Sequence, residues 1–89
     1  KRKVGQMTLD KAKAEQKLRI VRIHGGHLLR DRLYQMGLFE GTNIAVKQIS
    51  RLGGPLLIEC GGSRIALGRG MARQIDVEEI ESNALSNEK

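Results

Sequence analysis

The chain has 89 residues, 39% of them hydrophobic, with one cysteine, one tyrosine, one phenylalanine, no tryptophan and a formal net charge of +6. This length fits one small domain with a thin, aliphatic core, and the single cysteine excludes an internal disulfide. No apolar run approaches the roughly 18–20 residues that cross a bilayer, so we expect a protein that is not embedded in a membrane.

The first part of the chain predicts a short helix followed by a strand. Residues 8–14 favour a helix with Thr8 at its N-cap, but a helix this short is stable only when it docks on a core. The side chains expected to dock it are Leu9 and Ala12. Residues 17–24 alternate as a strand does, and the alternation slips between Ile20 and Val21. This slip indicates a bulge or a strong bend.

A second, longer helix is predicted over residues 28–36, after two glycines end the strand. Its apolar stripe consists of Leu29, Leu33 and Met36, which recur at i, i+4 and i+7. Gly37 follows as a left-handed C-cap, and Leu38 is expected to pack back on the helix as in a Schellman motif. A turn at Glu40 and Gly41 then leads into the next strand.

The second half of the chain predicts short strands over residues 43–49, 56–60, 64–67 and 73–78. The middle two form the clearest hairpin, because Gly61 and Gly62 tolerate the positive φ angles of a type I′ turn. In this register Ile58 lies opposite Ile65, and every pair along the hairpin matches in chemical character. A short irregular or 3₁₀ linker over residues 68–72 leads into the last strand, where Ile75 and Val77 point inward.

These elements predict a mainly β fold with short helices, in which the strands curl into a small SH3-like barrel with one inserted helix. A flat sheet of five short strands and one helix would leave one face uncovered, whereas a barrel encloses the aliphatic core and hides the sheet edges. We expect this domain to cover residues 7–80. Residues 1–6 are expected to be an N-terminal extension, and residues 81–89 a disordered, polar C-terminal tail.

The sequence predicts neither a catalytic site nor a metal or cofactor site. No serine, histidine and aspartate stand in the relation that nucleophilic catalysis needs. His24 and His27 have a His-x-x-His spacing, but nothing in the sequence places a third ligand near them, so we interpret them as loop histidines. Cys60 is interpreted as a small buried side chain at a strand end. The Gly68-Arg69-Gly70 run lacks the setting of a phosphate loop.

Four residues are candidate contacts with a protein partner: Arg30, Arg32, Phe39 and Leu52. Phe39 lies in a turn, and Leu52 lies in the loop over residues 50–55, where no strand pattern buries it. If exposed, Phe39 and Leu52 are candidate partner contacts, because aromatic side chains often anchor protein interfaces. The alternative for both apolar residues is packing against the core beneath the loops.

Twelve of the sixteen Lys and Arg residues lie within residues 1–52, against four Asp and Glu residues there, which leaves a nucleic-acid-binding barrel as an alternative. The basic residues of such a surface would be Arg22, Arg30, Arg32, Lys47 and Arg51. Barrels that bind nucleic acid usually stack bases on aromatic side chains of their strands. The only aromatic residues are Tyr34 and Phe39, and neither lies in a predicted strand, so we expect no nucleic acid partner. A transition-metal-binding module remains the other alternative.

Several segments of the chain, in this order and spacing, resemble the FeoA family, ferrous iron transport protein A. Residues 32–38 (RLYQMGL) are similar to the end of that family's helix, and residues 40–42 (EGT) to its turn, with Glu40 in place of the usual proline. Residues 19–23 (RIVRI), 54–56 (GPL), 64–67 (RIAL) and 72–77 (ARQIDV) continue the likeness. The resemblance extends over nearly the whole predicted domain.

The resemblance implies an SH3-like barrel that acts as an accessory or regulatory protein of bacterial ferrous iron uptake. It implies binding to the cytosolic part of the membrane transporter FeoB, and therefore a role in protein–protein regulation rather than catalysis, without a cofactor. The expected location is the cytoplasm, including a peripheral place at the inner face of the cell membrane.

Overall fold

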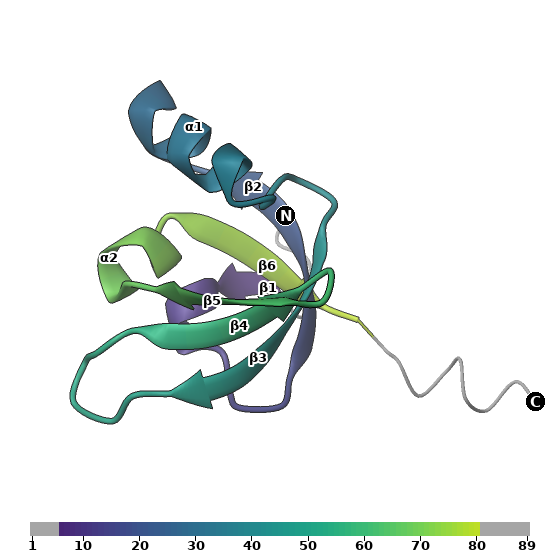
Figure 1. The fold of residues 1–89 in the computed structure, drawn as a ribbon, viewed down its shortest axis with the longest axis vertical. Helices are drawn as coiled ribbons and strands as arrows, with labels where there is room; N and C mark the ends of the chain where they lie inside the picture. Colours follow the sequence, from purple (N-terminus) through teal and green to yellow (C-terminus); the bar gives the residue numbers. More distant parts are fainter. Residues whose placement is uncertain (1–5, 81–89) are drawn as a thin grey trace, which may run out of the picture.

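A computed structural model describes residues 6–80 and shows one antiparallel sheet of six strands, with α1 at one end of the molecule (Figure 1). The elements are β1 (Gln6–Thr8), η1 (Leu9–Lys11), β2 (Lys17–Ile23), α1 (His27–Gln35), β3 (Asn43–Ile49), β4 (Leu56–Cys60), β5 (Ser63–Leu67), α2 (Arg69–Ala72) and β6 (Ile75–Glu79). Their order across the sheet is β1-β6-β2-β3-β4-β5. The mainly β fold with short helices, curled as an SH3-like small barrel, is confirmed.

Strand β1 was not predicted, because three residues give no alternating pattern. Gln6, which the sequence analysis places in the N-terminal extension, pairs with Glu78 of β6. The rest of that extension and the expected tail over residues 81–89 lie outside the described residues. The strands β1 and β5 form the two edges of the sheet, and η1 and α2 contact each other near these edges.

The core is aliphatic, as the composition predicts. Its buried side chains are Leu9, Ala12, Leu18, Ile20, Ile23, Leu33, Leu38, Ile44, Val46, Leu56, Ile58, Leu67, Ala72, Ile75 and Val77. Among the described residues no polar or charged side chain is buried, so the hydrophobic effect dominates the stability of this barrel. The inward positions of Ile75 and Val77 are confirmed.

Two bulges allow the strands to curl. The predicted slip in β2 is confirmed, because the register against β6 shifts between Ile20 and Arg22. The bulge at Val21 brings Ile23 to the same buried side as Ile20. A second shift, in β3 around Lys47, was not predicted. Both shifts increase the local twist, which lets a short sheet wrap around its core.

The β4–β5 hairpin has the predicted register throughout, from Leu56 opposite Leu67 to Cys60 opposite Ser63. Gly61 and Gly62 adopt φ angles of 58° and 86°, as a two-residue type I′ turn requires. The turn and the strand pattern are both local in sequence, and for this reason the register is the most accurate of the strand predictions.

The end of α1 is a Schellman motif, as predicted. The Leu38 amide donates to the Leu33 carbonyl at 2.9 Å, and the Gly37 amide donates to the Tyr34 carbonyl at 2.9 Å. Gly37 has a φ of 87°, a conformation that glycine adopts without steric cost. Leu33 and Leu38 are both fully buried, so this motif fixes the end of α1 on the barrel.

Replacing Gly37 with alanine is expected to lower the free energy of unfolding by about 1–2 kcal/mol, because a Cβ atom is strained at a positive φ. The matched control is Gly70→Ala, since Gly70 lies inside α2, has no positive φ and has no atom near the new methyl group. Alanine is the better helix former, so this variant should be as stable as the parent or more so. Urea unfolding of both variants measures the difference, and equal losses would contradict the C-cap argument.

Two expected elements differ in detail. The first helix is only the 3₁₀ turn η1, and Ala12 already has extended backbone angles, although Leu9 and Ala12 dock on the core as predicted. The Thr8 hydroxyl donates to the Asp10 carboxylate rather than capping a backbone amide. The last strand begins later than expected because Arg73 still belongs to the end of α2, the short helix that replaces the expected linker.

The side chain of Arg69 connects three parts of the chain. Its guanidinium donates to the carbonyl oxygens of Ser50 at 2.7 Å, Gly54 at 2.9 Å and Asp10 at 3.5 Å. These carbonyls belong to the two ends of the β3–β4 loop and to η1. We call this set of contacts the Arg69 brace. No sequence pattern around Arg69 predicts this structural role.

Candidate functional site

A surface with both aromatic and charged groups lies on α1 and on the turn that follows it. It consists of Arg30, Tyr34, Phe39 and Glu40, and we call it the helix–turn surface. The Tyr34 and Phe39 rings have their centroids 5.2 Å apart at an angle of 33°. Offset and tilted aromatic pairs of this kind attract each other, so the two rings form one apolar patch.

Glu40 joins the helix to the turn. Its carboxylate accepts a hydrogen bond from the Tyr34 hydroxyl at 3.2 Å and lies 3.8 Å from the Arg30 guanidinium. Arg30 also donates to the carbonyl of Ile23 at 3.4 Å, at the end of β2. The glutamate that departs from the family's usual proline therefore has partners of its own. These contacts are partly exposed, so they orient the surface more than they stabilise the fold.

The backbone of the turn is fixed to the neighbouring strand. The Gly41 amide donates to the Ile20 carbonyl at 2.7 Å, and the Ile20 amide donates to the Thr42 carbonyl at 2.9 Å. The Phe39 amide donates to the Thr42 hydroxyl at 3.2 Å. Phe39, 46% exposed, is thus presented from a turn whose hydrogen bonds are already made. Little conformational entropy remains to be lost when a partner covers it.

The start of α1 depends on Gly25. Its φ is 94°, and a Cβ atom there would lie 2.8 Å from the Leu29 side chain, which packs on the core. The chain therefore leaves β2 and enters α1 through a position that only glycine fills without strain. This sharp entry places Arg30 back over the end of β2.

The structure separates the four predicted partner contacts. Arg30 and Phe39 belong to the helix–turn surface, whereas Arg32 is exposed elsewhere on α1 and forms no ion pair among the described residues. Leu52 is 97% exposed in the β3–β4 loop, at the end of the molecule opposite α1 (Figure 1). The alternative of packing beneath loops is therefore wrong for Leu52, and Phe39 is only half covered.

Three residues of this region were missed by the sequence analysis: Leu28, Tyr34 and Glu40. Leu28 is 80% exposed, and its position outside the i, i+4, i+7 stripe of α1 is the signal that would have found it. Glu40 had no such signal, because its contacts with Arg30 and Tyr34 depend on the path of the turn.

The two histidines do not lie in one ligand set. His24 Nε2 lies 2.8 Å from the Asp76 carboxylate on the neighbouring strand β6, and His27 is the exposed first residue of α1. Across residues 6–80, no three His, Cys, Asp or Glu side chains are grouped to hold a metal ion. Cys60 is half-buried at the end of β4, with its Sγ atom 3.9 Å from the Gly37 carbonyl oxygen.

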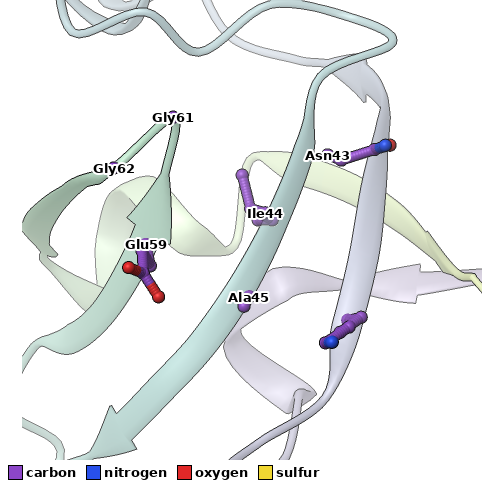
Figure 2. A pocket seen from close by; sticks show the side chains of 7 residues that line it. Asn43, Ile44, Ala45, Glu59, Gly61 and Gly62 are labelled. Carbon is purple, nitrogen blue, oxygen red and sulfur yellow. The ribbon is translucent and has the colours of Figure 1, made fainter. Parts of the chain in front are cut away.

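A pocket of about 250 Å³ opens between β3 and the tip of the β4–β5 hairpin. Figure 2 shows Glu59 on one side, the start of β3 on the other, and Gly61 and Gly62 at the hairpin tip. The pocket exists because the two glycines and Ala45 fill little space. Its rim carries both Lys17 and Glu59, a mixture that favours no ligand of a single charge, and it contains none of the predicted site residues.

The basic surface considered for nucleic acid is partly neutralised. Lys47 contacts Glu15 at 3.7 Å and Glu59 at 3.8 Å, and Arg30 contacts Glu40. The two aromatic rings contact each other on the helix–turn surface rather than lying along a strand. In the described part of the chain, α1 and α2 are both too short to cross a membrane.

The sequence profile of the FeoA domain matches residues 7–79. A protein assigned as Fe(2+) transport protein A from Methanocaldococcus jannaschii is 37% identical over 78 residues, which are 88% of this chain and 92% of that protein. A Fe(2+) transport protein A/Fe(2+) transporter FeoB fusion protein from Porphyromonas gingivalis is 37% identical over 68 residues. That match covers 76% of this chain but only 8% of the fusion protein.

Among solved structures, the crystal structure of an iron uptake regulatory protein, FeoA, superimposes with a TM-score of 0.79 at 36% sequence identity. The similarity covers 84% of this chain and 99% of that one. The similarity therefore extends over the whole barrel, including the helix inserted between β2 and β3, and is not limited to one motif.

Proposed function

Because the chain belongs to the FeoA family of ferrous iron transport accessory proteins, we propose that it binds the cytosolic part of the FeoB transporter through the helix–turn surface. Binding there would regulate transport from the cytoplasmic side, with no catalytic step and no cofactor in this chain. The observation that carries this proposal is a half-exposed Phe39, paired with Tyr34 and set beside Arg30 in a turn with a fixed backbone.

The fusion protein from Porphyromonas gingivalis supports FeoB as the partner. Its name describes one chain that holds both a FeoA and a FeoB part. A covalent link raises the effective concentration of one domain at the other, often to millimolar levels, so even a weak contact becomes populated. In the fusion protein the covalent link keeps the FeoA and FeoB parts together. Where the two are separate chains, a direct contact between them would have to do the same.

The chemistry of the helix–turn surface fits a protein partner. Aromatic residues and arginine are enriched at the centres of protein interfaces, where they contribute most of the binding energy. Tyr34 and Phe39 supply a rigid apolar area, and Arg30 supplies a charged group next to it.

Replacing Phe39 with alanine is expected to weaken binding to the cytosolic part of FeoB by about 2 kcal/mol, roughly thirtyfold in Kd. The reason is the loss of the aromatic area that a partner would bury. Isothermal titration of the full chain with that part of FeoB, in each nucleotide state, measures the effect. Urea unfolding of the variant shows whether the fold is kept, which we expect because the side chain is half-exposed.

The matched control is Leu52→Ala, since Leu52 is an exposed apolar residue at the opposite end of the molecule. Binding of this variant should equal that of the parent. If Leu52→Ala lost binding and Phe39→Ala did not, the contact would lie at the Leu52 end of the molecule, and the helix–turn surface would be excluded. Absence of saturable binding of the parent in every nucleotide state would overturn the proposal as a whole.

A further inference from the structure

The β3–β4 loop presents one apolar side chain entirely to solvent. Leu52 is 97% exposed, between the exposed Arg51 and Gly53, whose φ is 78°. With this exposure the side chain of Leu52 projects from the molecule. Transferring a large apolar side chain from water into an apolar environment is favourable in free energy. An exposed leucine at the tip of a loop is therefore suited to insert into a binding partner.

The base of this loop is fixed. The Arg69 brace ties the Ser50 and Gly54 carbonyls together, and a Cβ atom on Gly54 would lie 2.9 Å from that of Ser50. Leu52 is therefore held out from the barrel by a closed loop. Two loop carbonyls already accept hydrogen bonds from Arg69, which lowers the cost of bringing the loop toward a medium without water.

Basic side chains surround the same end of the molecule. The brace also holds η1 beside the base of the loop through the Asp10 carbonyl, and the turn that carries Lys13 follows η1. The turn after η1 joins β3 here, because the Val46 amide donates to the Gln16 carbonyl at 2.9 Å. Figure 1 shows this turn and the β3–β4 loop both at the end away from α1.

The net charge of this end is positive. Lys13 and Arg51 are exposed and form no ion pair within residues 6–80. Of the acidic groups nearby, the Asp10 carboxylate contacts Arg73 at 3.9 Å, and Glu15 shares Lys47 with Glu59 at 3.7 and 3.8 Å. We call Lys13, Arg51 and Leu52 together the Leu52 end.

We propose that the Leu52 end docks on the surface of a bilayer that contains anionic phospholipid. Leu52 enters the headgroup region, and the basic side chains of Lys13 and Arg51 lie against the lipid phosphates. A projecting apolar residue flanked by unpaired basic groups has the chemistry of an interfacial membrane contact. A protein partner with an acidic groove is less well matched, because a single projecting leucine offers it little area to bury.

This contact is weak and reversible by itself. Each Lys or Arg near an anionic bilayer contributes about a fivefold gain in partitioning, and one leucine is far shorter than a lipid anchor. The contact with the bilayer would orient this protein while the helix–turn surface at its opposite end binds another protein. The inference does not depend on the proposed binding to FeoB, because the two surfaces lie at opposite ends and binding to lipid vesicles needs no transporter.

The test uses Leu52→Trp in the full chain, since the protein has no tryptophan of its own. The full exposure of Leu52 lets the larger ring replace it without strain. With vesicles of equal parts phosphatidylglycerol and phosphatidylcholine, the tryptophan emission should move to shorter wavelength. With pure phosphatidylcholine the shift should be absent, and added salt should reverse it. In vesicle sedimentation, Arg51→Gln should lower partitioning about fivefold.

The matched control is Leu28→Trp, which places the reporter on α1 at the other end, where Leu28 is 80% exposed. Its emission should not change with either vesicle. No shift at position 52, equal shifts at both positions, or a shift insensitive to lipid charge would each overturn the proposal. A shift caused by the cytosolic part of FeoB but not by vesicles would also overturn it, and would assign the Leu52 end to a protein partner.

Discussion

Replacing Arg69 with alanine is expected to lower the free energy of unfolding by about 3 kcal/mol, and the melting temperature by about 15 °C. The variant removes a guanidinium that donates to three backbone carbonyls, two of them at 2.7 and 2.9 Å. Hydrogen bonds from a charged group contribute about 1.5–3 kcal/mol each, and the carbonyls of a tight loop do not easily find water instead. Urea and thermal unfolding measure the loss.

A neighbouring arginine provides the control. Arg73 is exposed, and its only ion pair in the described residues is the 3.9 Å contact with Asp10, so Arg73→Ala should cost less than about 0.5 kcal/mol. Arg69→Lys should recover only part of the loss, because an ammonium group does not reach three carbonyls as the planar guanidinium does. Equal stability of Arg69→Ala and Arg73→Ala would show that the brace does not stabilise the fold.

Replacing Leu33 with alanine is expected to cost about 3 kcal/mol, within the range for a fully buried leucine. Leu33 is the only residue of α1 that is fully buried, and its carbonyl also accepts the hydrogen bond from Leu38. The cavity therefore forms at the point where the helix meets the barrel. In Leu33→Ala we expect the amide hydrogens of α1 to exchange faster than those of the strands. The reason is that this variant weakens the contact between α1 and the core, so the helix opens more often.

The same variant should also weaken binding to the cytosolic part of FeoB, since the helix–turn surface depends on the position of α1. The control on the same helix is Leu28→Ala, which should change stability by no more than about 0.5 kcal/mol because Leu28 is 80% exposed. Titration and urea unfolding of both variants separate the two roles. A small stability loss in Leu33→Ala would contradict its position as the core contact of α1.

The elements predicted most accurately are those specified by residues close together in the chain. The Gly61–Gly62 turn sets the register of β4 and β5, and the Gly37 C-cap with Leu38 sets the end of α1. In both, a glycine at a positive φ and an apolar neighbour act within a few residues. The bulge in β2 belongs to the same class, because the slip of the apolar pattern is itself local.

The largest omissions concern contacts between distant parts of the chain. Strand β1 exists because Gln6 to Thr8 pair with β6, some seventy positions later, and three residues carry no pattern of their own. In the Arg69 brace, the guanidinium donates to carbonyls that are 15, 19 and 59 positions away in the sequence. No motif around Arg69 predicts these contacts. Both depend on how the barrel closes, which is a property of the whole sheet.

The candidate contacts show the same division. The sequence by itself determined an aliphatic barrel with an inserted helix, its family likeness, and the polarity of Arg30, Phe39 and Leu52, because composition, turn chemistry and periodicity are properties of neighbouring residues. Only the tertiary structure decided that Phe39 joins Tyr34 and Glu40 while Leu52 stands at the opposite end. The reason is physical: side-chain exposure and proximity depend on the curl of the sheet and on the closing contacts of η1, α2 and Arg69, which form only when distant segments meet.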